Sequence, residues 1–315
     1  MIDNYGRNID YLRISVTDLC NLRCVYCMPE GGVEKLRHGD ILSVEEIAEI
    51  SAAAASLGIK KIRLTGGEPL VRKGIMDIVR RTSRTPGVNE VALTTNGTLL
   101  AENAAALKEA GLTRVNISVD TFDPGKYKEI TRGGKIGDVL AGIRAAVDAG
   151  LEPIKLNAVL MGGVNDDFIR PLIAMTDDAD FRVRFIEIMP IGECADWNKE
   201  RFVSIAKVLE AEPSLEYAGT DGVSKLYRKP GSKGSIGLIS PISNHFCPTC
   251  NKLRVTADGK LKPCLHSAEE IQIRGLHGEE LAETIRMAIL SKPFKHALAG
   301  ERRSRSRRGM SAIGG

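Results

Sequence analysis

The sequence predicts an α/β fold, because short strand-like runs alternate with helix-like segments through its N-terminal part. Six of these runs are rich in β-branched or other apolar residues and are bounded by Gly, Pro or Asn. Such alternation implies parallel strands joined by right-handed crossovers. Six units are compatible with an open doubly wound sheet or with an incomplete barrel, and periodicity alone does not choose between them. The predicted strands are Tyr11–Val16, Lys61–Thr65, Val91–Thr95, Arg114–Val119, Ile154–Leu160 and Val183–Ile188.

The predicted helices lie between these strands and carry terminal signals. Ser43–Leu57 starts with Ser43 as N-cap, has Glu46 at the capping-box position and stops before Gly58. The other predicted helices of this part are Lys73–Arg84, Leu99–Ala110, Ile136–Ala149 and Asp166–Asp177.

The pattern changes after about Pro190, which predicts a second, smaller region. It includes helices at Trp197–Leu209 and Gly278–Leu290 and short strands at Lys225–Arg228, Ile236–Ile239 and Leu253–Thr256. We therefore expect two units, residues 1–195 and 196–315. The second unit ends in an Arg/Ser/Gly-rich tail, Gly300–Gly315, that we expect to be mobile.

Charge and hydropathy narrow the class of protein. The net charge of +4 equals that of Glu301–Arg308, so the remaining body is formally neutral, which argues against a nucleic-acid binder. No apolar run approaches the ~20 residues of a membrane helix, and the N-terminus has no signal pattern. We therefore expect a cytoplasmic protein. Six of its seven cysteines form two groups of three, which in a reducing compartment indicates metal binding rather than disulfides, while Cys194 is expected to be a free thiol.

The first cysteine group follows the first predicted strand and has the spacing C-x3-C-x2-C: Cys20, Cys24 and Cys27. Three thiolates on one loop can ligate three irons of a [4Fe–4S] cube and leave the fourth iron open. An open position is what a catalytic metal needs. A zinc loop is the alternative, but it requires a fourth ligand, and no finger-like spacing links the nearest candidate, His38.

These cysteines, together with Tyr26 and the turn Thr65-Gly-Gly-Glu-Pro69, resemble the radical S-adenosylmethionine (SAM) superfamily. The resemblance implies that the open iron binds SAM and that the reduced cluster cleaves it to methionine and a 5′-deoxyadenosyl radical. It implies a fold with an incomplete (β/α)6 TIM-like barrel and a smaller C-terminal α+β extension. Glu68 could help to hold the cationic amine of SAM. The implied SAM-binding residues are Tyr26, Gly67, Ser118 and Met189.

The second cysteine group comprises Cys247, Cys250 and Cys264. On spacing alone it suits zinc, with His245 or His266 as a fourth ligand, or a second [4Fe–4S] cluster with an open iron. Both interpretations stay open at this point.

Several longer segments are similar to the GTP 3′,8-cyclase family of molybdenum cofactor biosynthesis. They are Leu12–Asp18, Lys61–Leu70, Arg114–Asp120, Arg184–Pro190, the Cys-Asn-Lys-Leu-Arg run from Cys250 and the terminal Gly314-Gly315. The resemblance implies two [4Fe–4S] clusters and SAM as cofactors. It implies that the radical takes hydrogen from ribose C3′ of GTP and that C3′ then bonds to guanine C8, giving 3′,8-cyclo-7,8-dihydro-GTP. The second cluster would hold the guanine edge.

The same resemblance nominates GTP-binding residues, most of them cations suited to a triphosphate. The family usually has Arg-x-Arg where this chain has Lys252-Leu-Arg254, and Lys keeps the charge but loses the bidentate fork. Gly314 and Gly315 are implied to enter the active site. The nominated residues are Arg13, Arg63, Thr94, Lys155, Arg184, Lys252, Leu253 and Arg254.

Family resemblance also implies partners: a one-electron reductant of flavodoxin or ferredoxin type and a downstream cyclic pyranopterin monophosphate synthase. We expect no membrane or nucleic-acid partner, and a monomer or homodimer. Two alternative functions remain. One is a radical SAM enzyme that modifies a peptide and carries an auxiliary cluster, and the other is a non-catalytic iron–sulfur or zinc protein that binds nucleic acid.

Overall fold

We describe a computed structural model of the chain, covering residues 1–195, 197, 201–296, 298 and 304–314. In this part of the chain one sheet of twelve strands runs in the order β12-β11-β10-β1-β2-β3-β4-β5-β6-β9-β8-β7. The strands are β1 (Tyr11–Ser15), β2 (Lys61–Thr65), β3 (Glu90–Thr95), β4 (Arg114–Ser118), β5 (Lys155–Leu160), β6 (Arg182–Glu187), β7 (Glu216–Asp221), β8 (Ser224–Arg228), β9 (Ser235–Ile239), β10 (Lys252–Val255), β11 (Lys260–Lys262) and β12 (Ile271–Gln272).

The six strands predicted from the N-terminal part are β1 to β6, and each is parallel to its neighbour. Two strands from later in the chain extend this parallel set. β10 lies parallel to β1 at one edge, and β9 lies parallel to β6 at the other. Antiparallel strands β11, β12, β8 and β7 complete the two ends. The C-terminal region therefore continues the same sheet on both sides instead of forming a separate one.

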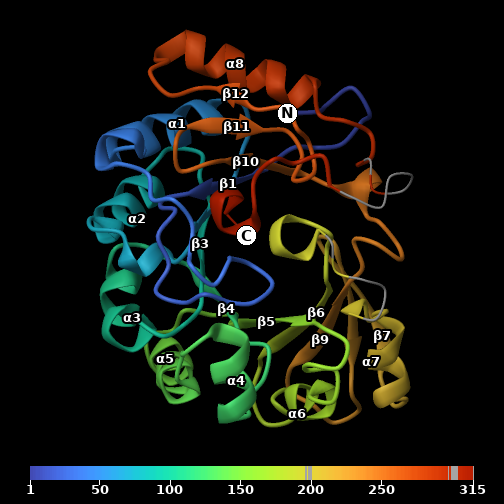
Figure 1. The fold of residues 1–315 in the computed structure, drawn as a ribbon. Coiled ribbons are helices and arrows are strands. Elements are labelled where there is room, and N and C mark those ends of the chain that lie inside the picture. The colour runs from blue at the N-terminus through green and yellow to red at the C-terminus, as the bar shows by residue number, and fades with distance from the viewer. Residues whose placement is uncertain (196, 198–200, 297, 299–303, 315) are drawn as a thin grey trace.

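Helices cover the outer side of the curved sheet, and the C-terminus lies inside the curve (Figure 1). The capping box predicted at Ser43 and Glu46 is present, with backbone-to-side-chain hydrogen bonds of 3.0 and 2.7 Å. The α-helices are α1 (Val44–Ser56), α2 (Ile75–Ser83), α3 (Leu100–Glu109), α4 (Pro124–Thr131), α5 (Ile136–Asp148), α6 (Ile169–Ala174), α7 (Ala206–Ala211), α8 (Gly278–Leu290) and α10 (Met310–Ile313); the 3-10 helices are η1 (His38–Asp40), η2 (Pro69–Val71), η3 (Gly192–Cys194) and η5 (Cys247–Thr249).

Two helix predictions need correction, and one helix was not predicted. The helix predicted over Trp197–Leu209 is wrong: Phe202 forms an antiparallel bridge with Met161, and α7 starts only at Ala206, while residues 198–200 lie outside the described part. The helix predicted from Asp166 begins at Ile169 because the polar residues before it form a turn, in which Asn165 accepts the Met161 N–H at 2.9 Å. The helix α4 was not predicted, although Asp123 as N-cap followed by Pro124 is a recognisable start signal.

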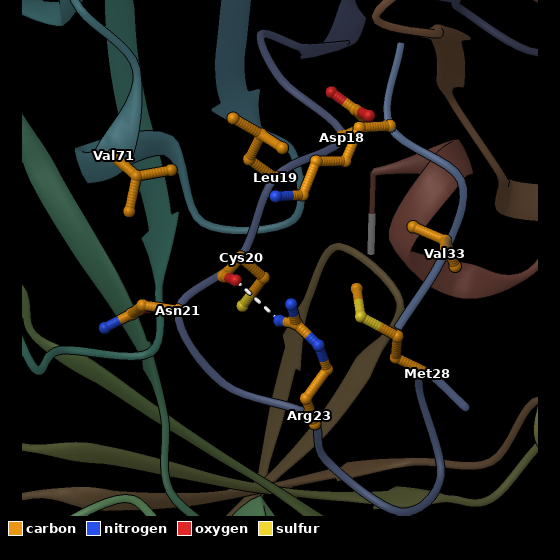
Figure 2. Close-up of a pocket in the computed structure, with 9 residues that line it drawn as sticks. Asp18, Leu19, Cys20, Asn21, Arg23, Met28, Val33 and Val71 are labelled. Atoms are coloured by element: carbon orange, nitrogen blue, oxygen red, sulfur yellow. Dashed lines mark hydrogen bonds between the residues drawn. The ribbon is translucent and has the colours of Figure 1, made fainter. Parts of the chain in front are cut away.

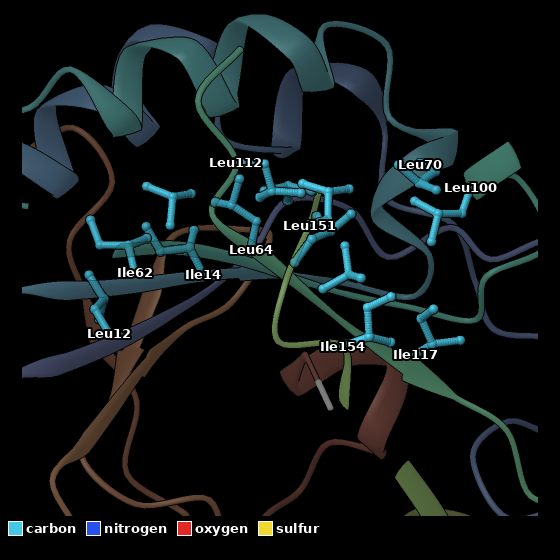
Figure 3. Close-up of a cluster of buried hydrophobic side chains, with 14 of the residues drawn as sticks. Leu12, Ile14, Ile62, Leu64, Leu70, Leu100, Leu112, Ile117, Leu151 and Ile154 are labelled. Atoms are coloured by element: carbon cyan, nitrogen blue, oxygen red, sulfur yellow. The ribbon is translucent and has the colours of Figure 1, made fainter. Parts of the chain in front are cut away.

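Alternate side chains of the parallel strands point to opposite faces. One face is apolar and packs under the helices, as Figure 3 shows for side chains such as Leu12, Ile14, Ile62 and Leu64, all of them fully buried. The opposite face is turned toward the inside of the curve and carries the polar side chains. The alternation of side chains along each strand therefore places the apolar core on one face of the sheet and the candidate site on the other.

Candidate active site

The first cysteine group lies on the loop that leaves the C-terminal end of β1. The Leu22 N–H donates to the Cys20 sulfur at 3.4 Å, and the side-chain amide of Asn96 approaches the same sulfur at 3.9 Å. Burial raises the pKa of all three thiols, that of Cys27 to about 12. Repulsion from other thiolates of the group adds to the rise at Cys24 and Cys27, and the charge of Glu68 adds to it at Cys20. Three mutually close, buried thiols are therefore neutral unless a metal stabilises their thiolates.

The donor chemistry of the two cysteine groups fits iron–sulfur cubes. Across the described residues, no three His, Cys, Asp or Glu side chains are placed to hold one single metal ion. A cube does not require such convergence, because each thiolate reaches a different iron. A cavity of about 240 Å³ adjoins Cys20, between Asp18, Arg23, Met28 and Val33 (Figure 2). Within the first cysteine loop, the Arg23 guanidinium donates a hydrogen bond to the Cys20 carbonyl at 2.7 Å.

Gly67 allows the turn after β2 to pack against the cysteine loop. A Cβ atom at this position would lie 2.3 Å from the Leu19 carbonyl oxygen, far inside contact distance. The Gly67 N–H donates to the Thr17 carbonyl at 2.9 Å, and the Glu68 N–H donates to Leu19 at 2.7 Å. The close approach that requires this glycine is therefore made by the protein backbone itself.

Glu68 is fully buried and joins the loops that follow β2 and β3. Its carboxylate accepts the Thr95 hydroxyl at 2.8 Å and the backbone N–H groups of Leu70 and Asn96 at 3.0 and 2.7 Å. Burial raises its pKa to about 7. These contacts show that Glu68 joins the two loops, and its role in holding the amine of SAM stays a prediction.

The other implied SAM-binding residues lie at the same edge of the sheet. The Tyr26 hydroxyl donates to Asp120 at 2.8 Å, which ties the cysteine loop to the residues after β4. Asp120 also accepts the Val159 N–H at 2.8 Å, and burial raises its pKa to about 6. Ser118 ends β4, and Met189 follows β6. Asp120 was not among the predicted site residues, although its position directly after a strand end was a usable signal.

A row of cations crosses the inner face of the sheet. Arg13 on β1 is in register with Arg63 on β2 and with Arg254 on β10, so the three side chains lie beside one another. Further along the same face, Lys155 on β5 is in register with Arg182 on β6. All six cations nominated from the sequence belong to this face: Arg13, Arg63, Lys155, Arg184, Lys252 and Arg254.

Burial and mutual repulsion oppose the charges of this row. Burial lowers the pKa of Lys155 and of Lys252 to about 7, and neighbouring guanidinium groups contribute in both cases. The pKa of Arg184 is lowered to about 10, again first by burial. Cations collected in this way are costly for the protein alone, and an anion between them would relieve that cost.

Several buried polar atoms of the inner face have no hydrogen-bond partner among the residues that the structure describes. They include the Nε atoms of Arg63 and Arg184, the Thr94 hydroxyl and the Asn157 side-chain oxygen. Buried polar groups are normally paired. The cation row and the unpaired polar atoms beside it are therefore more consistent with a binding site for a polar, anionic ligand than with a closed protein core.

Asp221 at the end of β7 was missed by the sequence analysis. Its carboxylate contacts Lys155 at 2.5 Å, Arg184 at 2.6 Å and Arg182 at 3.4 Å. Arg114 was also missed, and it pairs with Glu90 at 2.5 Å. Asp221 could not be found from strand alternation, because it reaches the row from a distant antiparallel strand. Arg114 could have been found, because it starts the predicted strand β4 and is in register with Ala92, which is itself in register with Arg63.

Leu253 does not share the face of its neighbours Lys252 and Arg254. Its side chain is fully buried in the apolar core. Because of the two-residue repeat of a strand, its side chain does not line the inner face, and only its backbone could contact a ligand there.

The second cysteine group surrounds the opposite end of β10. Cys247 is in η5, Cys250 precedes β10 and Cys264 follows β11. Burial raises the pKa of Cys247, whereas the ammonium groups of Lys292 and Lys252 outweigh burial at Cys250 and lower its pKa. The two trios thus lie at opposite ends of the paired strands β1 and β10, and the cation row lies between them.

Two buried cations hold the backbone around the second trio. Arg7 donates to the Cys247 carbonyl at 3.1 Å and to Lys292 and Pro293 carbonyls at 3.2 and 3.0 Å. The Lys292 ammonium donates to the carbonyls of Lys252 and Pro263 at 2.8 and 2.7 Å. The histidine rings near this trio contact one another, with centroids 4.9 Å apart for His266–His296 and 5.6 Å for His245–His296.

The C-terminal segment enters the inside of the curve. Arg254 donates to the Gly314 carbonyl at 2.9 Å, and Ser311 and Ile313 are buried. Residues 304–314 are therefore packed, which differs from the mobile tail expected for Gly300–Gly315. Gly315 and residues 300–303 lie outside the described part.

Comparisons with known proteins match this chain over its whole length. Residues 14–175 match the radical SAM superfamily, and residues 181–298 match the family described as Molybdenum Cofactor Synthesis C. The GTP 3′,8-cyclase of Alkaliphilus oremlandii is 52% identical over 320 residues, covering 100% of both chains. That of Listeria monocytogenes is 47% identical over 306 residues, covering 94% of this chain and 92% of its own.

Solved structures agree on the fold. Streptococcus suis SuiB bound to its precursor peptide gives a TM-score of 0.62 at 12% identity, covering 94% of this chain and 67% of that one. Methylornithine synthase (PylB) gives 0.51 at 18% identity, covering 65% and 62%. Among the described residues we find no helix long and apolar enough to cross a membrane. Membership of the superfamily implies a [4Fe–4S] cluster and SAM. The chain belongs to the GTP 3′,8-cyclase family of radical SAM enzymes.

Proposed function

We propose that this enzyme converts GTP to (8S)-3′,8-cyclo-7,8-dihydroguanosine 5′-triphosphate, the first step of molybdenum cofactor biosynthesis. The observation that carries the proposal is the buried cation row between the two cysteine trios. A triphosphate carries about four negative charges, far more than the single Asp221 carboxylate that contacts Lys155 and Arg184, and would offset the repulsion within this row. A radical SAM enzyme acting on a peptide gives no reason to bury these cations.

Cys20, Cys24 and Cys27 would hold the catalytic cluster. The cluster and SAM, when bound, supply the one-electron chemistry that starts hydrogen abstraction from the ribose. Tyr26, Gly67, Ser118 and Met189 would surround SAM at the strand ends. Their task is to orient it and to exclude water, because a misdirected radical attacks whatever is nearest.

The residues assigned to GTP lie on the inner face. Arg13, Arg63 and Arg254 would bind phosphate oxygens with forked donors, and Lys252 and Lys155 would act as point charges. Arg184 and Thr94 would contribute further donors, and Leu253 would be limited to backbone contact. The family's usual arginine at position 252 is replaced by Lys, so we expect binding to persist with looser geometry.

Cys247, Cys250 and Cys264 would hold a second [4Fe–4S] cluster whose fourth iron faces the guanine edge. The curved parallel sheet would serve as an incomplete (β/α)6 barrel extended by the C-terminal strands, enclosing the reaction. We further propose a cytoplasmic enzyme that receives electrons from a flavodoxin or ferredoxin and passes its product to a cyclic pyranopterin monophosphate synthase.

The test uses anaerobically reconstituted protein. We expect about eight irons per chain, whereas four irons plus zinc would overturn the two-cluster assignment. Reduced protein is then incubated with SAM and each nucleoside triphosphate in turn. We expect 5′-deoxyadenosine and a cyclised nucleotide only with GTP. Equal turnover with ATP, or turnover with none of them, would contradict the proposed function.

A further inference from the structure

The C-terminal segment 304–314 links the surroundings of the second trio to the inside of the sheet (Figure 1). At its start, the Ser304 hydroxyl contacts His266 at 3.1 Å, and the Ser304 N–H donates to the Pro190 carbonyl at 3.2 Å. At its end, Gly314 accepts the hydrogen bond from Arg254. Arg308 lies between these two ends.

Arg308 is held by two carboxylates at once. Its guanidinium meets Asp258 with contacts of 3.0 and 2.8 Å, and it meets Glu270 with contacts of 2.7 and 2.8 Å. The three side chains are only 17–19% exposed. Burial opposes the charge of Arg308, but the two carboxylates outweigh it and raise its pKa. We call this group, Arg308 with Asp258 and Glu270, the arginine clamp.

The carboxylates of the clamp are themselves fixed to the sheet. Asp258 lies in the turn between β10 and β11 and accepts the Thr256 hydroxyl at 2.6 Å. Glu270 precedes β12 and pairs with Lys262 at 3.3 Å. Forked ion pairs between fixed, half-buried groups define a position far better than exposed pairs do.

Beyond Arg308 the chain has little freedom before it reaches the candidate site. The Gly309 Cα would lie 2.9 Å from a Cβ placed on Gly192, so the two backbones are in close contact. A Cβ placed on Gly309 would also lie 4.0 Å from the Cys27 carbonyl oxygen, so the segment runs beside the first cysteine loop. Ser311, two residues on, is buried, and its backbone hydrogen bond to Cys27 opposes the rise in the pKa of that thiol. Three residues later the Gly314 carbonyl meets Arg254.

We propose that Arg308 is a positioning residue: the arginine clamp holds the C-terminal segment so that Ser311 donates to the Cys27 sulfur and Gly314 meets the cation row. Hydrogen bonds to ligand sulfurs raise the reduction potential of iron–sulfur clusters, because they stabilise the more negative reduced state. The packed segment also keeps water from the reacting groups. The exclusion of water from the reaction rests on the proposed function, whereas the effect on the reduction potential does not.

The test compares Arg308→Gln with Arg307→Gln in the reconstituted full-length enzyme. Arg307 is the adjacent exposed arginine, so the control removes the same charge from the same segment. In Arg308→Gln we expect faster hydrogen exchange in peptides covering 304–314, a more negative midpoint potential of the first cluster, and a higher ratio of 5′-deoxyadenosine to cyclised product. Arg307→Gln should match the wild type in all three.

Further variants separate positioning from folding. Asp258→Asn removes one carboxylate charge of the arginine clamp and leaves the sequence of residues 304–314 unchanged. It should reproduce the faster hydrogen exchange and the more negative midpoint potential of Arg308→Gln. A variant that only folds poorly would lose iron and total turnover while keeping the wild-type potential and product ratio, and that outcome would overturn the proposal. An unchanged potential with unchanged exchange in Arg308→Gln would overturn it as well. Absence of GTP-dependent turnover in the wild type would instead reject the proposed function. Hydrogen exchange of residues 304–314 and the midpoint potential of the first cluster would still test the arginine clamp.

Discussion

Arg63 on β2 lies directly beside Arg13 on β1, and both guanidinium groups belong to the buried inner face of the sheet. Burial lowers the pKa of both, and their mutual repulsion adds to the effect at Arg13. Two like charges side by side in a protein interior favour an anionic ligand over the empty state.

Arg63→Met should therefore stabilise the ligand-free protein and weaken GTP binding. Removing one buried like charge relieves repulsion, whereas losing a charge-assisted contact costs about 1.5–3 kcal/mol of binding energy, or roughly tenfold to a hundredfold in Kd. Thermal unfolding with and without GTP measures both effects. Arg144→Met, at an exposed position of α5, is the matched control. A destabilised variant with wild-type affinity would count against the assignment of Arg63.

Lys155 should make GTP affinity depend on pH. Burial lowers its pKa to about 7 in the free protein. Below that pH the ammonium is present, and as pH rises above about 7 it is lost, so its contribution to affinity falls by up to about tenfold per pH unit. Binding titrations between pH 6 and 9 test this. Lys155→Arg should flatten the profile, because Arg stays charged and the ionisation of GTP is common to both proteins.

The partner of Lys155 provides a second check on the same titration. Asp221 opposes the pKa depression of Lys155 through its hydrogen bond and charge. Asp221→Asn should therefore move the fall in affinity to lower pH. A profile identical to that of the wild type would show that Lys155 is not the group that titrates.

Gly67→Ala should prevent assembly of the first cluster while sparing the second. The added Cβ would meet the Leu19 carbonyl at 2.3 Å and the Asp18 carbonyl at 2.8 Å, so the cysteine loop has to move. We expect about four irons per chain instead of about eight. Gly31→Ala is the control, since a Cβ there meets nothing within 4 Å. Full iron content in Gly67→Ala would contradict this account.

Lys292→Met should disrupt the second trio. It removes the donor to the carbonyls of Lys252 and Pro263, which flank Cys250 and Cys264, and leaves both without that bond in a buried site. We expect a loss of about 3 kcal/mol in stability and selective loss of iron from the second group. Lys295→Met, three residues away and exposed, should leave both measurements unchanged.

The sequence was sufficient for the features that repeat locally or are held by short spacing. Strands β1 to β6 and helices such as α1 follow from alternation and capping, and the cysteine loop follows from its spacing. Polar turns before two helices made the starts of those helices unpredictable from periodicity. The segment before α6 and the residues before α7 make side-chain and bridge contacts that override helical periodicity.

What the tertiary structure decided is which distant elements meet. The sequence determined that the chain carries two cysteine trios and cations within otherwise apolar strands. Only the folded sheet placed β10 beside β1 and β9 beside β6 and brought Asp221 to Lys155. The first cysteine loop, which spacing alone identified, thus gained its partners Asp120 and Ser311 from elsewhere in the chain. The physical reason is that pairing between distant strands is set by the packing of whole faces, and no local pattern encodes that packing.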